Sequence, residues 1–230
     1  MNVGKSRAKV GFLHTTPATI NMVEAGMRAH VPDTECVHIY DSRIRAENFR
    51  SPPGEMPRIN MVRYLHYAQE LEHDGCMVIV SCCSLMGRAT AFARQAVSVP
   101  FIQLDDIVLE KAVREHARIG IICTTEHTVP CVREQLEQKA HMLGKQVELI
   151  FSVNTEAFKY FYEGKIEAHD SLLVAEMRKM EMRDVDCIVL GQIPLALAEP
   201  AFRADTWRVP LYYAGAEAFQ HIAELMEGQK

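Results

Sequence analysis

The chain repeats itself at a spacing of about 110 residues, and this repeat limits the folds it can adopt. The stretch KVGFLHTT at 9–16 returns as RIGIICTT at 118–125, and Val-Pro at 99–100 returns as Val-Pro at 209–210. Ordered matches at nearly one offset indicate a duplicated half. A chain of 230 residues is long enough for two lobes, each with its own core.

The two copies differ at one position with chemical consequences. The apolar run that ends at Cys82 returns as the run that ends at Gln192, an offset of 110. The sequence therefore pairs a cysteine in the first half with a glutamine in the second.

Short apolar runs bounded by turn signals alternate with stretches of helical periodicity. Strands are predicted at 9–14, 35–40, 76–82, 100–103, 118–123, 147–151, 186–191 and 210–212. Helices are predicted at 18–30, 57–73, 86–97, 105–116, 127–143, 155–163 with 168–182, 194–203 and 214–227. This order predicts an α/β fold of two pseudo-twofold-related flavodoxin-like lobes, each a four-stranded parallel sheet flanked by helices.

We expect residues 1–103 plus 208–230 to form lobe 1 and residues 104–207 to form lobe 2, with the active-site cleft between them. Ligands of open parallel sheets bind beyond the carboxyl ends of the strands. Site residues are therefore sought at the strand ends, and recognition of the substrate side chain is expected from loops such as 42–57 and from residues after 192.

Composition limits the partners and the compartment that we expect for this chain. The 25 Lys and Arg against 30 Asp and Glu give a net charge of −5, with no basic stripe, which argues against nucleic acid and anionic membrane as partners. No apolar run approaches the roughly 18 residues of a membrane span, and no signal peptide is apparent at the N-terminus. Seven cysteines, an odd number, fit reduced thiols and a cytoplasmic location.

Cys82 ends an apolar strand where a helix should begin. Unpaired backbone N–H groups and the positive end of that helix favour thiolate, which can act as a base or a nucleophile. The alternative is a small buried hydrophobic residue, a common fate of cysteine. The neighbouring Cys83 fits packing beneath the helix better than a chemical role, and Ser84 fits a helix cap or an anion contact.

Hydroxyl pairs follow the first strand of each half, Thr15-Thr16 and Thr124-Thr125. Each pair can cap the next helix, or can hold a carboxylate with its hydroxyls and free amides. Presence in both halves favours the second role. His14 could orient the thiolate or transfer protons, or it could be structural.

Metal and cofactor sites are not expected. The chain contains no Cys-x-x-Cys or His-x-x-x-His motif, no acidic cluster of metal spacing, and no Gly-rich phosphate loop after a strand.

With its two-copy organisation and a cysteine after the third strand, the chain resembles the aspartate/glutamate racemase superfamily, which includes hydantoin racemases, maleate isomerases and arylmalonate decarboxylases. The matching segments are FLHTTP at 12–17, IVSCCS at 79–84, IICTT at 121–125 and IVLGQ at 188–192. The resemblance implies two cysteines, one from each lobe, on opposite faces of a carbon next to a carboxylate. Cys82 matches the first, whereas Gln192 occupies the place of the second, and an amide cannot exchange a proton in that way.

The resemblance implies a cofactor-independent isomerase of the racemase type that acts on a small carboxylic acid through Cys82 alone. His14 and Gln192 would orient groups or transfer protons. The carboxylate would be held by residues from both halves, namely Thr15, Thr16, Cys83, Ser84, Thr124 and Thr125. The alternatives are a single-cysteine lyase or decarboxylase of the same superfamily and a non-catalytic carboxylate sensor. A homodimer is expected from the resemblance only.

Overall fold

The computed structural model describes residues 7–229, which divide into two compact units. The first lobe comprises the chain up to Arg50, Met56–Leu104 and the chain from Gly215 onward. The second lobe comprises Ser51–Glu55 and Asp105–Ala214. Each lobe is described on its own below.

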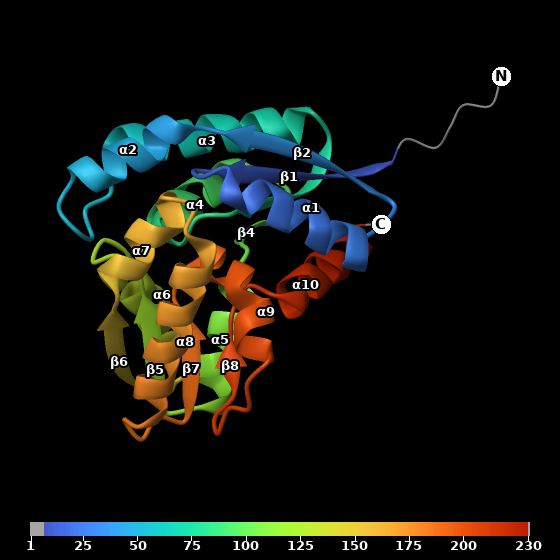
Figure 1. The fold of residues 1–230 in the computed structure, drawn as a ribbon. Helices are drawn as coiled ribbons and strands as arrows, with labels where there is room; N and C mark the ends of the chain where they lie inside the picture. The colour runs from blue at the N-terminus through green and yellow to red at the C-terminus, as the bar shows by residue number, and fades with distance from the viewer. Residues whose placement is uncertain (1–6, 230) are drawn as a thin grey trace. The chain divides into compact units, whose positions relative to one another are not determined.

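The first lobe is built on a parallel four-stranded sheet of order β2-β1-β3-β4 (Figure 1). Its strands are β1 (Ala8–His14), β2 (Thr34–Tyr40), β3 (Cys76–Ser81) and β4 (Phe101–Gln103). Its helices are α1 (Ala18–His30), α2 (Ser42–Arg50), α3 (Arg58–His73), α4 (Gly87–Ala93) and α10 (Ala216–Glu227), with short 3-10 turns at Ser84–Met86 and Arg94–Ala96. Helices α1 and α10 pack together on one face, and α3 and α4 pack together on the other.

The second lobe repeats this plan with a parallel sheet of order β6-β5-β7-β8. Its strands are β5 (Arg118–Cys123), β6 (Glu148–Val153), β7 (Cys187–Leu190) and β8 (Leu211–Tyr212). Its helices are α5 (Asp106–Glu115), α6 (Thr128–Met142), α7 (Thr155–Tyr162), α8 (Ile166–Glu181) and α9 (Glu199–Arg203), with a 3-10 segment at Ile193–Ala198. One core lies between this sheet and α5 and α6, and a second core includes residues of α8 and α9.

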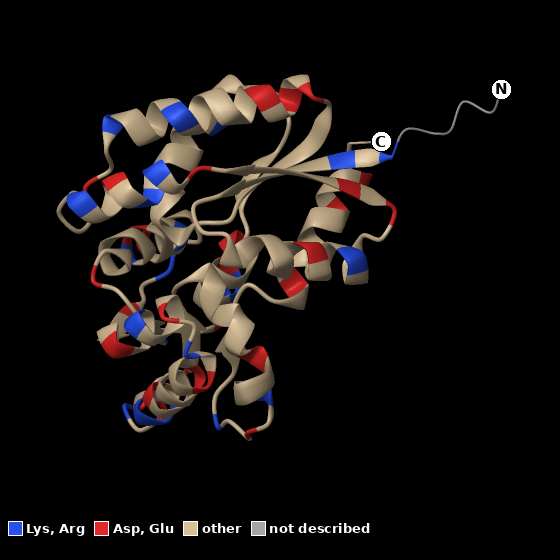
Figure 2. Cartoon of the chain, turned by 45° about the horizontal axis from the view of Figure 1, so that its top comes forward, with Lys and Arg blue, Asp and Glu red and all other residues tan. Residues whose placement is uncertain are grey.

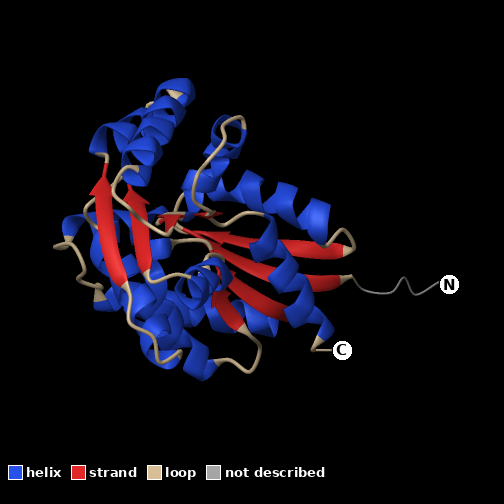
Figure 3. Cartoon of the chain, turned by 90° about the horizontal axis from the view of Figure 1, so that it is seen from below, coloured by secondary structure: helices blue, strands red, loops and turns tan. Residues whose placement is uncertain are grey.

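The predicted fold class is confirmed. Figure 3 shows strands flanked by helices in both lobes, and both sheets are wholly parallel with the flavodoxin-like order 2-1-3-4. The strands are buried because β-α crossovers cover both faces of a parallel sheet. Val10, Phe12 and Val80 in the first lobe and Ile119 and Ile121 in the second are fully buried.

The lobe boundary near the C-terminus differs from the predicted one at 207/208. Strand β8 pairs with β7 and completes the second sheet, so the second lobe extends to Ala214. Only α10 returns to the first lobe, where it packs on α1. The repeat explains this result: Val209-Pro210 copies the Val99-Pro100 pair that precedes β4, so it leads into the fourth strand of its own half.

The structure also corrects the pairing of Cys82 with Gln192. The amide of Cys82 donates to the Leu13 carbonyl, and the amide of Gly191 donates to the Ile122 carbonyl, each at 2.9 Å. Leu13 and Ile122 are 122 − 13 = 109 apart, as are Cys82 and Gly191 (191 − 82 = 109). The structural counterpart of Cys82 is therefore Gly191.

Two further features support an offset of 109 at this point. Cys83 and Gln192 both have extended backbone and both precede a 3-10 turn. Gly75 and Asp184, which precede β3 and β7, share a left-handed backbone with φ of 82° and 57°. The Pro100 and Pro210 carbonyls, which accept from Ile79 and Ile188, are 110 apart, so the extra residue enters only after β7.

Residues 42–50 form helix α2 rather than the predicted loop. Few apolar residues mark this helix, and Asp41 supplies its N-terminal cap, because one carboxylate oxygen accepts from the Arg43 amide at 2.9 Å. The Arg43 guanidinium donates to both carboxylate oxygens at 2.8 Å, and the Tyr67 hydroxyl donates at 2.7 Å. These donors lower the pKa of Asp41 to about 2.

We expect the free energy of unfolding to fall at acid pH because the stabilising contribution of ionised Asp41 is lost. Its contribution is fully present above the pKa of an unfolded aspartate, about 3.9, and is lost as the pH falls through about 2. We expect Asp41→Asn to cost on the order of 1 kcal/mol at neutral pH, since the exposure of Arg43 screens the pair. Urea unfolding at pH 7 and pH 3 measures this effect, with the exposed Asp33→Asn as control. An equal cost at both pH values would show that the ionised carboxylate does not contribute.

The described part of the chain shows how the charged residues and the cysteines are distributed. Basic and acidic residues alternate over the helices (Figure 2). Among the described residues, no helix combines the length and apolar character needed to cross a membrane. All seven cysteines lie in this part, and none forms a disulfide.

Candidate active site

Adjacent strand ends bring the predicted residues of the first lobe together. β1 and β3 are neighbours in the sheet, with Leu13 in register with Ser81. The residues at the carboxyl ends of these strands are therefore close to one another, namely His14, Thr15 and Thr16 at the end of β1, and Cys82, Cys83 and Ser84 after β3. All six are buried, with exposed fractions between 1% and 9%.

The backbone places Cys82 and His14 side by side on one face of the sheet. Phe12 is in register with Val80, and successive residues of a strand point to opposite faces. His14 and Cys82 each come two residues later, and the Cys82 amide continues the ladder by its bond to Leu13. This face is covered by α1 and α10. Cys82 therefore has the neutral imidazole of His14, described below, as its neighbour on the adjacent strand.

Cys83 packs toward the opposite face. It belongs to the core cluster that contains Tyr64 and Met86, and its carbonyl accepts from the Gln103 side chain at 3.2 Å. The fully buried Tyr64 hydroxyl lies 3.1 Å from the Ser81 hydroxyl. Burial raises the pKa of Tyr64 well above its usual value, and the nearby thiols of Cys83 and Cys82 raise it further. Tyr64 is thus a neutral support beneath the cysteine pair.

His14 is held by hydrogen bonds on both ring nitrogens. Its Nδ1 lies 2.7 Å from the Thr19 hydroxyl, which itself donates to the Thr16 carbonyl at 3.0 Å. Its Nε2 lies 2.9 Å from Nδ1 of His38, whose Nε2 lies 3.0 Å from Glu24. Burial, followed by the neighbouring His38, lowers the pKa of His14 to about 3.

These contacts fix the proton positions along the chain of side chains. Because the Thr19 hydroxyl donates its only hydrogen to Thr16, it must accept from Nδ1 of His14. The bare Nε2 of neutral His14 then accepts from Nδ1 of His38. Nε2 of His38 lies in turn 3.0 Å from the Glu24 carboxylate. His14 is therefore a single, oriented tautomer beside Cys82.

In the second lobe, the side chain of Gln192 binds Thr124, the residue that follows β5. Its Oε1 accepts from both the amide of Thr124 at 2.5 Å and the hydroxyl of Thr124 at 2.9 Å. The Thr125 hydroxyl accepts from the His127 amide at 3.4 Å. The predicted second-lobe residues Thr124, Thr125 and Gln192 thus lie together at the carboxyl ends of β5 and β7. The cleft predicted between the lobes stays a prediction.

Buried cysteines of the second lobe are not equivalent to Cys82. Cys123 occupies the position that matches His14, and Cys187 lies inside β7; both are fully buried. Burial raises the pKa of Cys187 to about 12 and that of Cys123 further still. A β-carbon at Gly191 would come within 2.8 Å of the Cys123 sulfur, so this sulfur fills the space that a side chain at 191 would need.

We expect this loop to be stabilised by a hydrogen-bond acceptor oxygen at position 192, whether that oxygen belongs to an amide or to a carboxylate. Gln192→Ala leaves the Thr124 amide without that acceptor and is expected to cost about 1–3 kcal/mol of unfolding free energy. Gln192→Glu retains an oxygen at the same place and should cost clearly less. Urea unfolding of both variants tests this order. Equal losses would mean that the hydrogen bond contributes nothing.

One group near the site escaped the sequence analysis. Glu24 of α1 meets Cys36 and His38 of β2, and the only sequence signal for this group is the alternation Cys-x-His within a strand. Burial and the Glu24 charge raise the pKa of Cys36 to about 11. The contact of α1 with β2 that forms this group comes from tertiary packing, which the spacing of Glu24 does not reveal.

Comparison with known proteins gives a family match over most of the chain. The profile of the Asp/Glu/hydantoin racemase family matches residues 10–222. No curated protein is similar enough in sequence to count as a match.

Solved structures with the same fold include several racemases. A glutamate racemase of Bacillus anthracis superposes with a TM-score of 0.73 at 16% identity, covering 96% of this chain and 82% of that one. An aspartate racemase of Picrophilus torridus gives 0.68 at 14% identity, covering 96% and 94%. An allantoin racemase of Klebsiella pneumoniae gives 0.67 at 18% identity, covering 96% and 88%. These likenesses show the fold.

Proposed function

Because the chain belongs to the Asp/Glu/hydantoin racemase family, we propose that it is a racemase-type isomerase that acts through Cys82 at the carbon next to the carboxylate of a small acid. The observation that carries the assignment is the register of β1 and β3, which sets Cys82 beside the oriented, neutral His14. Cys83, which packs with Tyr64 and Met86, supports the site from below.

The chemistry follows from what a thiolate can do next to hydrogen-bond donors. Cys82, as thiolate, removes the proton on the carbon next to the carboxylate, and the electron pair spreads into the carboxylate as an enediolate. Hydroxyls and amides at Thr15, Thr16 and Ser84 bind the carboxylate and stabilise that charge. Thr124 and Thr125 are proposed to contribute in the same way from the second lobe. The Cys82 thiol then returns a proton to the carbon: return to the original face restores the starting enantiomer, and return after the planar enediolate has turned its other face to Cys82 gives the opposite one.

The second lobe favours chemistry on one face of the carbon. The residues that match Cys82 and Cys83 are Gly191 and Gln192, which have no acidic proton to exchange. The same observation supports a second candidate, a lyase that protonates one face after loss of carbon dioxide. A carboxylate sensor without turnover remains the non-enzymatic alternative.

Incubation in D₂O separates these functions. The probes are single enantiomers of aspartate and glutamate, a 5-substituted hydantoin and a disubstituted malonate, followed by proton NMR and chiral chromatography. We expect deuterium to replace the hydrogen next to a carboxyl or hydantoin carbonyl group; loss of carbon dioxide from the malonate identifies the lyase. Protection of Cys82 from alkylation without turnover identifies the sensor. With neither exchange nor protection, the proposal fails.

A further inference from the structure

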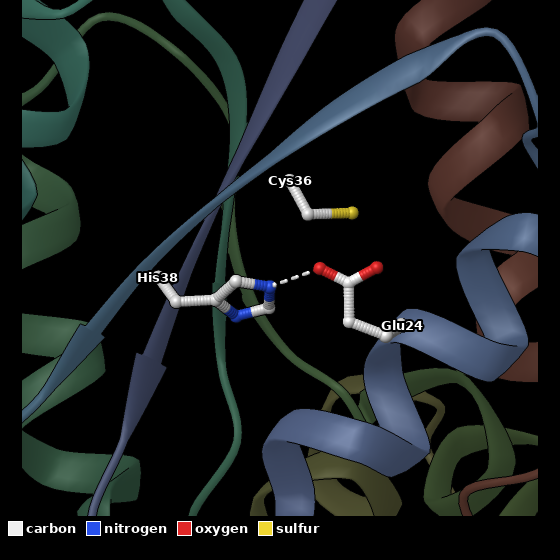
Figure 4. A group of neighbouring side chains, drawn as sticks. All are labelled: Glu24, Cys36 and His38. Carbon is white, nitrogen blue, oxygen red and sulfur yellow. Dashed lines mark hydrogen bonds and ion pairs between the residues drawn. The ribbon is translucent and has the colours of Figure 1, made fainter.

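A group of mixed ligand side chains lies beside the site but takes no part in the proposed reaction. Cys36 and His38 are two residues apart on β2 and so share a face, and Glu24 of α1 lies over that face (Figure 4). One ligand atom from each residue lies within 4.8 Å of the other two. The group is half-buried, with exposed fractions of 17% for the His38 side chain and 43% for Glu24.

We propose that Glu24, Cys36 and His38 form a binding site for a transition metal ion of the Zn²⁺ class. Thiolate, imidazole and carboxylate are the three ligand types that Zn²⁺ takes from proteins. Three protein ligands leave a fourth position of the tetrahedron for water, which the partial exposure of Glu24 permits. Close approach of the ligand atoms is already present, since Nε2 of His38 lies 3.0 Å from Glu24.

The surroundings of His38 support a metal ligand in particular. Histidines that bind metals commonly donate their other ring N–H to a protein acceptor, which fixes the ring and its tautomer. Here Nδ1 of His38 donates to Nε2 of His14, whose own Nδ1 is held by Thr19. This arrangement leaves Nε2 of His38 directed at Glu24 and Cys36 (Figure 4).

Binding exchanges protons for the metal. The Cys36 thiol loses its proton to solvent as its sulfur binds the ion as thiolate, the ion takes the place of the hydrogen bond between His38 and Glu24, and no electrons move. Without metal, the same side chains form a hydrogen-bonded pair beside a protonated thiol. A structural ion pair and a metal site therefore make different predictions.

Titration of the intact protein with Co²⁺ distinguishes them. We expect one equivalent to produce a thiolate-to-cobalt charge-transfer band, which one equivalent of Zn²⁺ abolishes. Cys36→Ser should remove the band, and His38→Gln and Glu24→Gln should weaken binding at least 10-fold. His14→Gln, which alters the acceptor for Nδ1 of His38 and leaves all three ligands in place, should weaken binding about 10- to 100-fold.

Two matched variants locate the signal. Cys131→Ser removes another half-buried thiol, and Cys82→Ser removes the thiol next to His14; both should retain the band. Far-ultraviolet circular dichroism verifies that each variant is folded. Absence of a saturable band in the native protein, or a band that persists in Cys36→Ser, would overturn the proposal. Neither result bears on turnover by Cys82, which is measured without metal.

Discussion

Replacement of Cys82 by alanine is expected to lower hydrogen exchange at the substrate carbon by about 10²- to 10⁴-fold, the usual contribution of a positioned acid–base group. Cys82→Ser should fall by a similar factor, because a serine hydroxyl is a far weaker acid than a thiol and forms almost no anion at neutral pH. Both variants should still bind the carboxylate, since the proposed anchors at Thr15, Thr16 and Ser84 are unchanged.

The matched control is Cys76→Ala at the other end of β3. Cys76 and Cys82 are 2% and 1% exposed, so both substitutions remove a buried sulfur, one at the start of β3 and the other just after its end. Cys76→Ala should lose stability by packing and retain exchange activity per folded molecule. A third variant, Cys83→Ala, tests the neighbouring thiol: loss of exchange there, with normal exchange in Cys82→Ala, would transfer the acid–base role to Cys83.

Gly26→Ala is expected to be the most destabilising single-methyl change in the first lobe. A β-carbon at Gly26 on α1 would overlap the Phe219 ring of α10. An aromatic ring cannot yield by a small rotation, and overpacking of this kind costs about 1–3 kcal/mol. The better helix propensity of alanine returns at most about 1 kcal/mol. Urea unfolding should therefore show a net loss of stability.

Two further variants isolate the cause. Gly228→Ala, at the end of α10, meets only atoms 3.6 Å away or farther and should be nearly neutral. Adding Phe219→Leu to Gly26→Ala should recover part of the loss, because the smaller side chain makes room for the methyl group. If the double variant is less stable by the sum of the two single losses, the contact between α1 and α10 is not the origin.

Most of the fold could be predicted because its signals are local. Buried parallel strands form continuous apolar runs, and the repeat supplied each run twice, so all eight strands were found within a few residues of their bounds. Helix α2 was missed because it carries few apolar residues, and its Asp41 cap is held both by the neighbouring Arg43 and by a tertiary contact with Tyr67 of α3.

The candidate site was less accessible to sequence. The strand-end residues were identified, but the pairing of Cys82 with Gln192 was wrong by one residue, because letters align equally well at offsets of 109 and 110 and only backbone register decides between them. The bonds from His14 to His38 and Glu24 join three separate segments. The spacing of these three residues along the chain does not indicate that they are in contact.

The return of α10 to the first lobe has a consequence for synthesis on the ribosome. The second lobe is nearly continuous in sequence, so its core residues are all translated before α10. The first lobe is translated earlier yet waits for that last helix, which covers one face of its sheet together with α1. The second lobe can therefore fold without α10 whereas the first cannot, and a released chain truncated before Gly215 should resist protease in the second lobe while β1 and β3 remain open to cleavage.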